Sequence, residues 1–376
     1  MPPSAAPLPA PPGSDGCPGL RRPALLPGLV RLRRGATSAQ LGVDPPHAVV
    51  LVGLAPGHHA LLGALDGSLD RAGLDGLAAR VGLGPADVDD LLALLAERGL
   101  LVDAGRAIAL PGLSHADRVR LAPDLASLVL QHGTDAAART ALRRRRGAWV
   151  DVRGAGRVGS AIATLLGAAG VGRVSVADPV PAAVTDQGPA GLVHLETGGS
   201  RELATRERVR SVAASTRVVR GAAPARPGLV VLAPADGPDA VLVATWSRRS
   251  SPHLLAYVRE TTGVVGPLVV PGSTGCLLCL DLHRRDRDPA WPVIAIQLGR
   301  GALASACDVT LATLVAAQAA MQVLAYLDGT ETIVRDATLE TSVRSGTTRR
   351  RSWSPHPACG CRWAHVTDQP PEAVAR

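Results

Sequence analysis

The spacing of apolar residues predicts a small helical domain in the first third of the chain. A β-like run, Ala48–Gly53 (AVVLVG), comes first. Helical spacing then covers His58–Leu65, Leu74–Val81 and Asp87–Glu97, and the following run GLLVDAGRAIAL has the pattern of a two-stranded wing. Three helices followed by a wing predict a winged-helix-like α+β domain over residues 29–115.

The pattern changes to alternating strands and helices near residue 147. Residues 116–146 are predicted to form a linking helix that ends in four arginines. A buried strand, Trp149–Val152, then precedes a helix of small residues from Ser160 and a second strand, Val174–Ala177. This order predicts a Rossmann-like α/β domain over residues 147–362.

The ends of the chain and its longest apolar helix bear on its location. The proline-rich residues 1–28 and the last residues, 363–376, are predicted to be tails, and the first of these lacks the pattern of a signal peptide. The run 307–327 predicts a helix with little polar surface, which belongs either to the core or to a homodimer interface. No apolar run reaches about 18 residues, so we expect no membrane span and a cytoplasmic protein.

A glycine fingerprint lies between the two predicted strands of the α/β domain. Gly154 permits a tight turn, Gly156 lets the backbone approach a phosphate, and Gly159 lets the helix pack closely on the strand. Asp178 ends the second strand, where a carboxylate can bind ribose hydroxyls. The pattern predicts a nucleotide-binding fold, and its ligand could be a dinucleotide, ATP or none.

Four cysteines form two close pairs in the C-terminal third. Cys276 and Cys279 form CLLC, and Cys359 and Cys361 form CGC. Four thiolates in tetrahedral geometry favour zinc, and the absence of a histidine at catalytic spacing favours a structural site over a catalytic one. The redox alternative is weaker, because the CLLC pair does not open a thioredoxin-like unit. Cys307 falls within the apolar helical run and is expected to be a core residue.

The excess of basic residues is weak evidence for a nucleic-acid or membrane partner. The 376 residues include no lysine, so all 40 basic residues are arginine, and the formal net charge is +8. Much of the excess comes from Arg143–Arg146 and Arg349–Arg351, which we interpret as solvated runs. Asp87–Glu97, the third helix of the domain and the second of its helix–turn–helix, is acidic, which argues against DNA binding.

These motifs together resemble the ThiF/MoeB type of adenylyltransferase, over residues 147–362. The resemblance rests on the glycine loop, the acid after the second strand and the two distant cysteine pairs. It implies a ThiF-type fold with a zinc clip, which activates the C-terminus of a ubiquitin-like partner with ATP and magnesium. The segment VVGPLVVPGSTGCLLCLDLHRRDRDPAWP and the later HPACGC look closer to an actinobacterial branch, whose members are cyclodehydratase-associated proteins that bind a precursor leader peptide.

The resemblance implies roles for individual residues. Asp178 corresponds to the ribose-binding acid, Asp236 in LVVLAPADG to the metal-binding catalytic aspartate, and the four paired cysteines to the zinc ligands. Two family features are missing, because DPVPAAVTDQGPAGL lacks the asparagine–arginine motif and the chain has no lysine. Loss of one such group costs about 3–4 kcal/mol of transition-state stabilisation. Arg201 and Arg206 are candidate replacements, and the sequence does not choose between them.

Three hypotheses follow from these observations. The first is a binding protein of peptide maturation, whose winged helix holds a precursor peptide and whose ThiF-like body has a degenerate ATP site and docks a modifying enzyme or dimerises. The second is an active ATP-dependent adenylyltransferase that acts on a peptide or ubiquitin-like C-terminus. A third, a nicotinamide-dependent oxidoreductase, lacks an identifiable acid–base pair.

Overall fold

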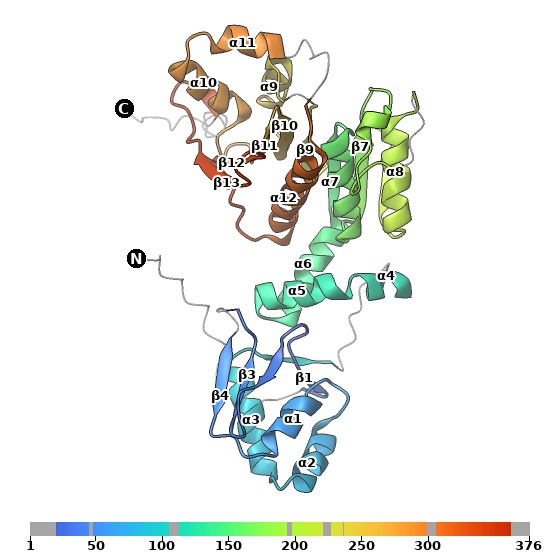
Figure 1. Cartoon of the computed structure of the whole chain (residues 1–376), viewed down its shortest axis with the longest axis vertical. Helices are drawn as coiled ribbons and strands as arrows, with labels where there is room; N and C mark the ends of the chain where they lie inside the picture. The colour runs from blue at the N-terminus through green and yellow to red at the C-terminus, as the bar shows by residue number, and fades with distance from the viewer. Residues whose placement is uncertain are drawn as a thin grey trace, which may run out of the picture. The chain divides into compact units, whose positions relative to one another are not determined.

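The computed structural model describes most of the chain as two compact units. The described residues are 20–44, 48–104, 113–193, 198–220, 227–235, 237–298 and 306–361. The units are Met1–Ala141 and Leu142–Arg376 (Figure 1).

Two small antiparallel sheets belong to the N-terminal unit. The strands β2 (Arg31–Arg33), β3 (Ser38–Leu41) and β4 (Val49–Val52) pair in the order β2-β3-β4, which makes β4 an edge strand. Strands β1 (Pro23–Leu25) and β5 (Leu101–Asp103) form a separate pair. Composition placed β1 in the N-terminal tail, yet all three of its residues are buried. Its pairing joins segments far apart in the sequence, which local composition does not encode.

Three helices lie between β4 and β5 where the apolar spacing predicts them. They are α1 (His58–Ala64), α2 (Arg71–Arg80) and α3 (Pro85–Glu97). Helix α3 buries the positions expected of one helical face, Val88, Leu91, Leu92 and Leu95. The second half of the predicted wing lies outside the described residues, and β5 pairs with β1 instead. The winged-helix interpretation therefore stays a prediction.

The predicted linking helix of residues 116–146 is three helices, which corrects the sequence interpretation. They are α4 (His115–Arg120), α5 (Ala122–His132) and α6 (Asp135–Gly147). Pro123 lies in the first turn of α5 and has no N–H to continue a helix from α4. Gly133 ends α5 in the left-handed conformation, with φ 71°.

The C-terminal unit is built on an eight-stranded sheet in the order β13-β12-β11-β10-β9-β6-β7-β8. Five strands are parallel, namely β8 (Arg217–Arg220), β7 (Arg173–Ala177), β6 (Trp149–Arg153), β9 (Leu229–Leu232) and β10 (His253–Arg259). The antiparallel remainder is β11 (Thr262–Val269), β12 (Ala337–Ser342) and β13 (Thr348–Ser352). The chain runs outward from β6 through β7 to β8, then returns to β9 on the other side of β6. This reversal creates a crevice at the carboxyl ends of β6 and β9, where ligands bind in open α/β sheets.

Helices connect and cover these strands. They are α7 (Arg157–Ala168), α8 (Arg201–Val212), α9 (Ala240–Trp246), α10 (Leu277–Arg287), α11 (Trp291–Leu298) and α12 (Val309–Asp328). Helices α7 and α12 lie side by side and pack together (Figure 1). Their buried side chains join those of the central strands in one hydrophobic core.

Helix α12 confirms the predicted apolar helix. One of its faces buries Leu311, Val315, Ala319 and Val323 in the core. Among the described helices, it alone has the length and hydropathy to cross a membrane. Its buried face is that of a core helix, while Met321 is 65% exposed on the opposite side. Dimerisation through this helix remains a prediction.

Candidate functional site

A cavity of about 680 Å³ occupies the crevice beside the glycine loop. Its lining comes from the loop after β6, the end of β7, the start of α8 and the end of β9. The three fingerprint glycines and Asp178 all line it, so the fold brings together the residues that the fingerprint predicts. Their role in nucleotide binding remains a prediction.

Steric contacts explain two of the glycines. Gly154 has φ 99°, and a Cβ there would lie 2.1 Å from the carbonyl oxygen of Ala233. A Cβ on Gly159 would lie 1.9 Å from the carbonyl oxygen of Gly154. A Cβ on Gly156 would meet nothing within 4 Å, so its backbone is open to a ligand. Close packing therefore requires the outer two glycines, and access to the cavity is the remaining reason for the third.

Asp178 braces the glycine loop as well as lining the cavity. Its Oδ2 accepts a hydrogen bond from the backbone N–H of Ala155 at 2.6 Å, and its Oδ1 accepts one from Val180 at 2.8 Å. Its side chain is only 6% exposed. The carboxylate therefore has a structural role in the described chain, alongside any contact with a ribose.

The cavity contains two guanidinium groups. Arg201 donates from Nε and Nη2 to the two carboxylate oxygens of Asp186, each at 2.6 Å, and its Nη1 lies 3.7 Å from Asp178. Arg157, the first residue of α7, donates to the carbonyl oxygens of Thr185 and Cys307. The sequence left Arg201 and Arg206 as alternatives, and only Arg201 is among the described residues that line the cavity.

Sequence reasoning missed Asp186, which lies in the segment that lacks the expected motif. Among the described lining residues, Asp178 and Asp186 supply two negative charges, and Arg157 and Arg201 supply two positive ones. These charges cancel, so the side chains give no net attraction to an anion. The N-terminus of α7 still directs its positive end at the loop. The only sequence signal for Asp186 was its position eight residues after Asp178.

Two further expectations concern the same cavity. Asp236, the predicted catalytic aspartate, lies outside the described residues, although Ala235 before it lines the cavity. Cys307 was expected to be a core residue within a helix. It instead precedes α12, is half-buried and lines the cavity. Asp308, the N-cap of α12, accepts from Thr310 and Leu311 and starts the helix after Cys307.

The four paired cysteines form one cluster at the start of α10. Their sulfur atoms all lie within 4.8 Å of one another. The Sγ of Cys276 is 3.9 Å from that of Cys279 and 3.6 Å from that of Cys359, and Cys279 is 3.6 Å from Cys361. A zinc ion about 2.3 Å from each of four sulfurs separates the sulfurs by about 3.8 Å. The cluster can therefore hold a metal such as zinc, and it is the one such group of ligands among the described residues.

The hydrogen bonds in the cluster stabilise one thiolate, that of Cys276, and a neighbouring histidine holds the CGC turn. A hydrogen bond from the Cys279 thiol lowers the pKa of Cys276 to about 4, and burial raises the pKa of Cys359 to about 11. His356 precedes the second pair and is fixed through both ring nitrogens. Its Nδ1 accepts from the N–H of Ala358, which places the proton on Nε2, 2.7 Å from Asp286. The CGC turn is thereby attached to α10.

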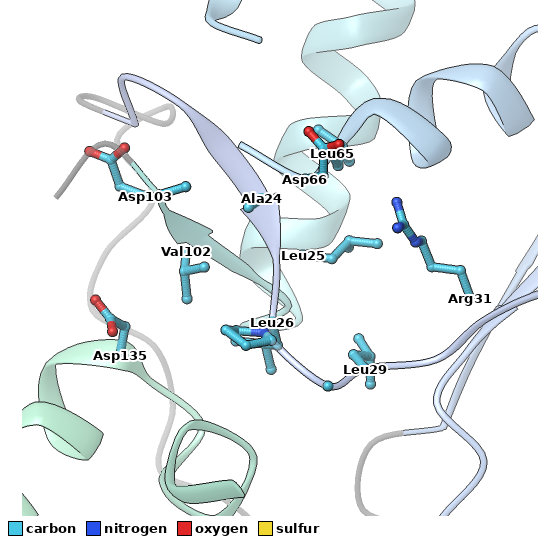
Figure 2. A pocket seen from close by; sticks show the side chains of 13 residues that line it. Ala24, Leu25, Leu26, Leu29, Arg31, Leu65, Asp66, Val102, Asp103 and Asp135 are labelled. Carbon is cyan, nitrogen blue, oxygen red and sulfur yellow. The ribbon is translucent and has the colours of Figure 1, made fainter. Parts of the chain in front are cut away.

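A second cavity, of about 450 Å³, lies within the N-terminal unit (Figure 2). Leu25, Leu26 and other apolar residues line it, together with three carboxylates. Asp66 accepts from the N–H of Ser68, and Asp103 accepts from the N–H of Arg22. Asp135, the third, pairs with Arg139, so all three carboxylates already have local partners.

No protein-family model matches the chain, and no curated protein matches its sequence. Solved structures do match its fold. Escherichia coli MccB crystallised with MccA-N7isoASN has a TM-score of 0.66 at 14% identity, over 91% of this chain and 99% of MccB. MccB with ATP has a TM-score of 0.63 at 15% identity, over 90% of this chain and 99% of MccB. PaaA has a TM-score of 0.66 at 15% identity, over 87% of this chain and 98% of PaaA.

The fold is therefore a mixed α/β architecture similar to ThiF-type folds. At these identities the likeness concerns the fold alone. It agrees with the fold that the motifs imply, and it does not bear on the actinobacterial branch.

Proposed function

We propose that the chain is a ThiF-like component of peptide maturation, which binds a peptide through its N-terminal unit and has a degenerate ATP site. The similar fold of MccB, which was crystallised with MccA and is described as the microcin C7 biosynthetic enzyme, supports a peptide as the partner. That likeness extends over 91% of this chain, which includes most of the N-terminal unit. A docked modifying enzyme and a homodimer belong to the same proposal.

The edge strand β4 is the observation that carries peptide binding. Val50 and Val52 are 44% and 75% exposed, while Leu51 between them is buried against the unit. β4 pairs with β3 through one edge, and no described strand pairs with the other. An exposed, β-branched edge strand is an aggregation hazard unless a strand covers it, and an extended peptide can do so by strand addition.

The charge balance of the large cavity supports the degenerate site. Nucleotidyl transfer requires positive charge where the phosphates develop negative charge. The guanidinium of Arg201 is the best-placed cation, and it is bound through two hydrogen bonds to Asp186. A triphosphate would compete with a carboxylate for the same donors.

Fluorescence anisotropy of the full chain tests the peptide site. The probes are labelled peptides from the short reading frames encoded beside the gene. We expect one of them to bind, and Val52→Asp to weaken its binding at least about tenfold, because a charge on the edge strand opposes apolar pairing. Val119→Asp is the matched control, since Val119 is 61% exposed on α4. Failure of every peptide to bind, or equal losses in both variants, would refute the proposal.

An active adenylyltransferase is the second candidate function. Arg201 favours it, because this residue places a cation in the cavity of a chain that has no lysine. Exchange of radiolabel between pyrophosphate and ATP, in the presence of the bound peptide, measures the activity directly. Exchange that is abolished by Arg201→Ala and retained in Arg206→Ala would establish this function over the first.

A further inference from the structure

Strand β13 forms one edge of the eight-stranded sheet and carries three consecutive arginines. It pairs only with β12 among the described strands. Arg349 and Arg350 are exposed and Arg351 is half-buried. Their side chains alternate between the two faces of the sheet, so Arg349 and Arg351 share one face and Arg350 lies on the other.

The ladder between β12 and β13 leaves specific backbone groups facing outward. The N–H of Ser342 donates to the carbonyl of Thr347, and the N–H of Trp353 donates to that of Asp336. Hydrogen-bonded positions alternate along an antiparallel strand, so 347, 349, 351 and 353 bond inward to β12. The backbone groups of Thr348 and Ser352, and those of position 350 between them, therefore point away from the sheet and can bond an added strand.

Contacts with the rest of the unit hold the arginines in place. Arg349 donates from Nε and Nη2 to Glu340 on β12, at 3.0 and 2.6 Å. The guanidinium groups of Arg351 and Arg287 lie 4.4 and 5.0 Å from the ring centroid of Trp353. That ring is 3% exposed, so it is a fixed platform. An edge strand whose charges serve only to prevent aggregation does not need side chains that are fixed in this way.

Positive charge is in excess on this face. Arg349 and Arg351 both pair with the carboxylate of Glu340, and Arg287 lies over the same Trp353 ring as Arg351. Burial lowers the pKa of Arg351, and repulsion from Arg287, Arg349 and Arg284 lowers it further. A second copy of β13 would add more like charge, whereas an anionic segment would relieve the repulsion.

We propose that the β13 edge binds an extended, acidic segment of a partner protein by strand addition, with carboxylates at alternating positions facing Arg349 and Arg351. The added strand would bond the outward backbone groups of positions 348–352. This surface is separate from the β4 edge and from the large cavity, so the proposal does not depend on the proposed function.

Anisotropy titration of the full chain tests this proposal with defined probes. The first is a labelled peptide that alternates glutamate with threonine and valine. The second replaces each glutamate with lysine, and the third is a labelled single-stranded DNA. We expect the glutamate peptide to bind and the lysine peptide not to bind.

Two variants separate charge from strand addition. Arg349→Glu with Arg351→Glu should weaken binding at least about tenfold. Arg210→Glu with Arg217→Glu makes the same change in net charge at exposed positions of α8 and β8 and should have no comparable effect. Ser352→Pro keeps every arginine and removes an outward N–H, so it should also weaken binding, while inward ladder bonds remain. Circular dichroism and thermal unfolding verify that each variant is folded.

Each remaining outcome overturns the proposal. Binding of the glutamate peptide that survives Ser352→Pro would exclude strand addition, and equal binding of DNA would identify a general polyanion surface instead. Equal losses in the two arginine pairs would place the effect in net charge alone. No binding of the glutamate peptide would leave β13 as a protected edge.

Discussion

Replacing Asp186 with asparagine should increase the affinity of the large cavity for magnesium ATP. In the native chain, Asp186 binds Arg201 through two hydrogen bonds of 2.6 Å and is itself only 9% exposed. The substitution keeps the shape of the side chain and one acceptor for Arg201. It removes one of the two carboxylates that balance the two guanidinium groups of the cavity, and the lining gains a net positive charge.

The expected size of the effect follows from Coulomb's law. A unit charge about 7 Å from a phosphate charge contributes about 2.4 kcal/mol at an effective dielectric constant of about 20. The cavity is open to solvent, so we reduce this to about 1–2 kcal/mol, which is a roughly five- to thirtyfold gain in affinity.

Isothermal titration calorimetry of the full chain with magnesium ATP measures this change. Glu207→Gln, an exposed position on α8 that removes the same charge outside the cavity, is the matched control. An unchanged or weaker affinity in Asp186→Asn would refute the argument that charge neutrality keeps the site inactive. Tight binding by the native chain would also refute it and would favour the adenylyltransferase.

Three further predictions concern stability and the metal. Cys279→Ser should lower the zinc content below one ion per chain and lower the melting temperature, because metal binding contributes to folding. Cys307→Ser is the control and should retain the metal. Elemental analysis measures the zinc content of both variants, and thermal unfolding measures their stability. Asp328→Asn removes the negative charge from the buried Arg145–Asp328 pair, whose hydrogen bonds are 2.8 and 2.6 Å long. The free energy of unfolding should fall by about 3–5 kcal/mol, which corresponds to roughly 10 °C in Tm. A shift in Tm as small as that of Glu207→Gln would contradict this prediction. Burial lowers the pKa of His253, so the stability of the native chain should be retained above the unfolded pKa of about 6.5 and lost as pH falls below it. In His253→Asn the decline of Tm between about pH 7 and 5 should be smaller, and an equal decline would show that other groups control it.

The N-terminal unit shows which elements the local sequence pattern can predict and which it cannot. The helices α1 to α3 follow from apolar residues at helical spacing, and α3 is further specified by the proline in its first turn. The strand β1 could not be predicted in this way. Its run of three apolar residues is too short to predict a strand, and only its pairing with the distant β5 makes it one.

The sequence by itself determined the α/β start of the C-terminal unit and the composition of the cysteine cluster. Gly159 is required by the carbonyl oxygen of Gly154, which the strand–turn–helix itself brings close, so the spacing of the two glycines is a local signal, whereas the steric contact that requires Gly154 is with the distant Ala233. The cysteine pairs likewise suggest a metal site from chemistry alone, although Cys279 and Cys359 are 80 positions apart in the sequence and this separation gives no distance in space.

Tertiary structure decided the character of the large cavity. The pairing of Asp186 with Arg201, the entry of Cys307 into the lining and the absence of Arg206 from its described part depend on how β7, α8 and α12 meet around the crevice. These contacts join side chains whose separation is fixed by sheet order and helix packing rather than by spacing along the chain. The sequence shows which charged residues the chain contains. Which of them line the same cavity, and therefore the net charge of that cavity, depends on the tertiary structure.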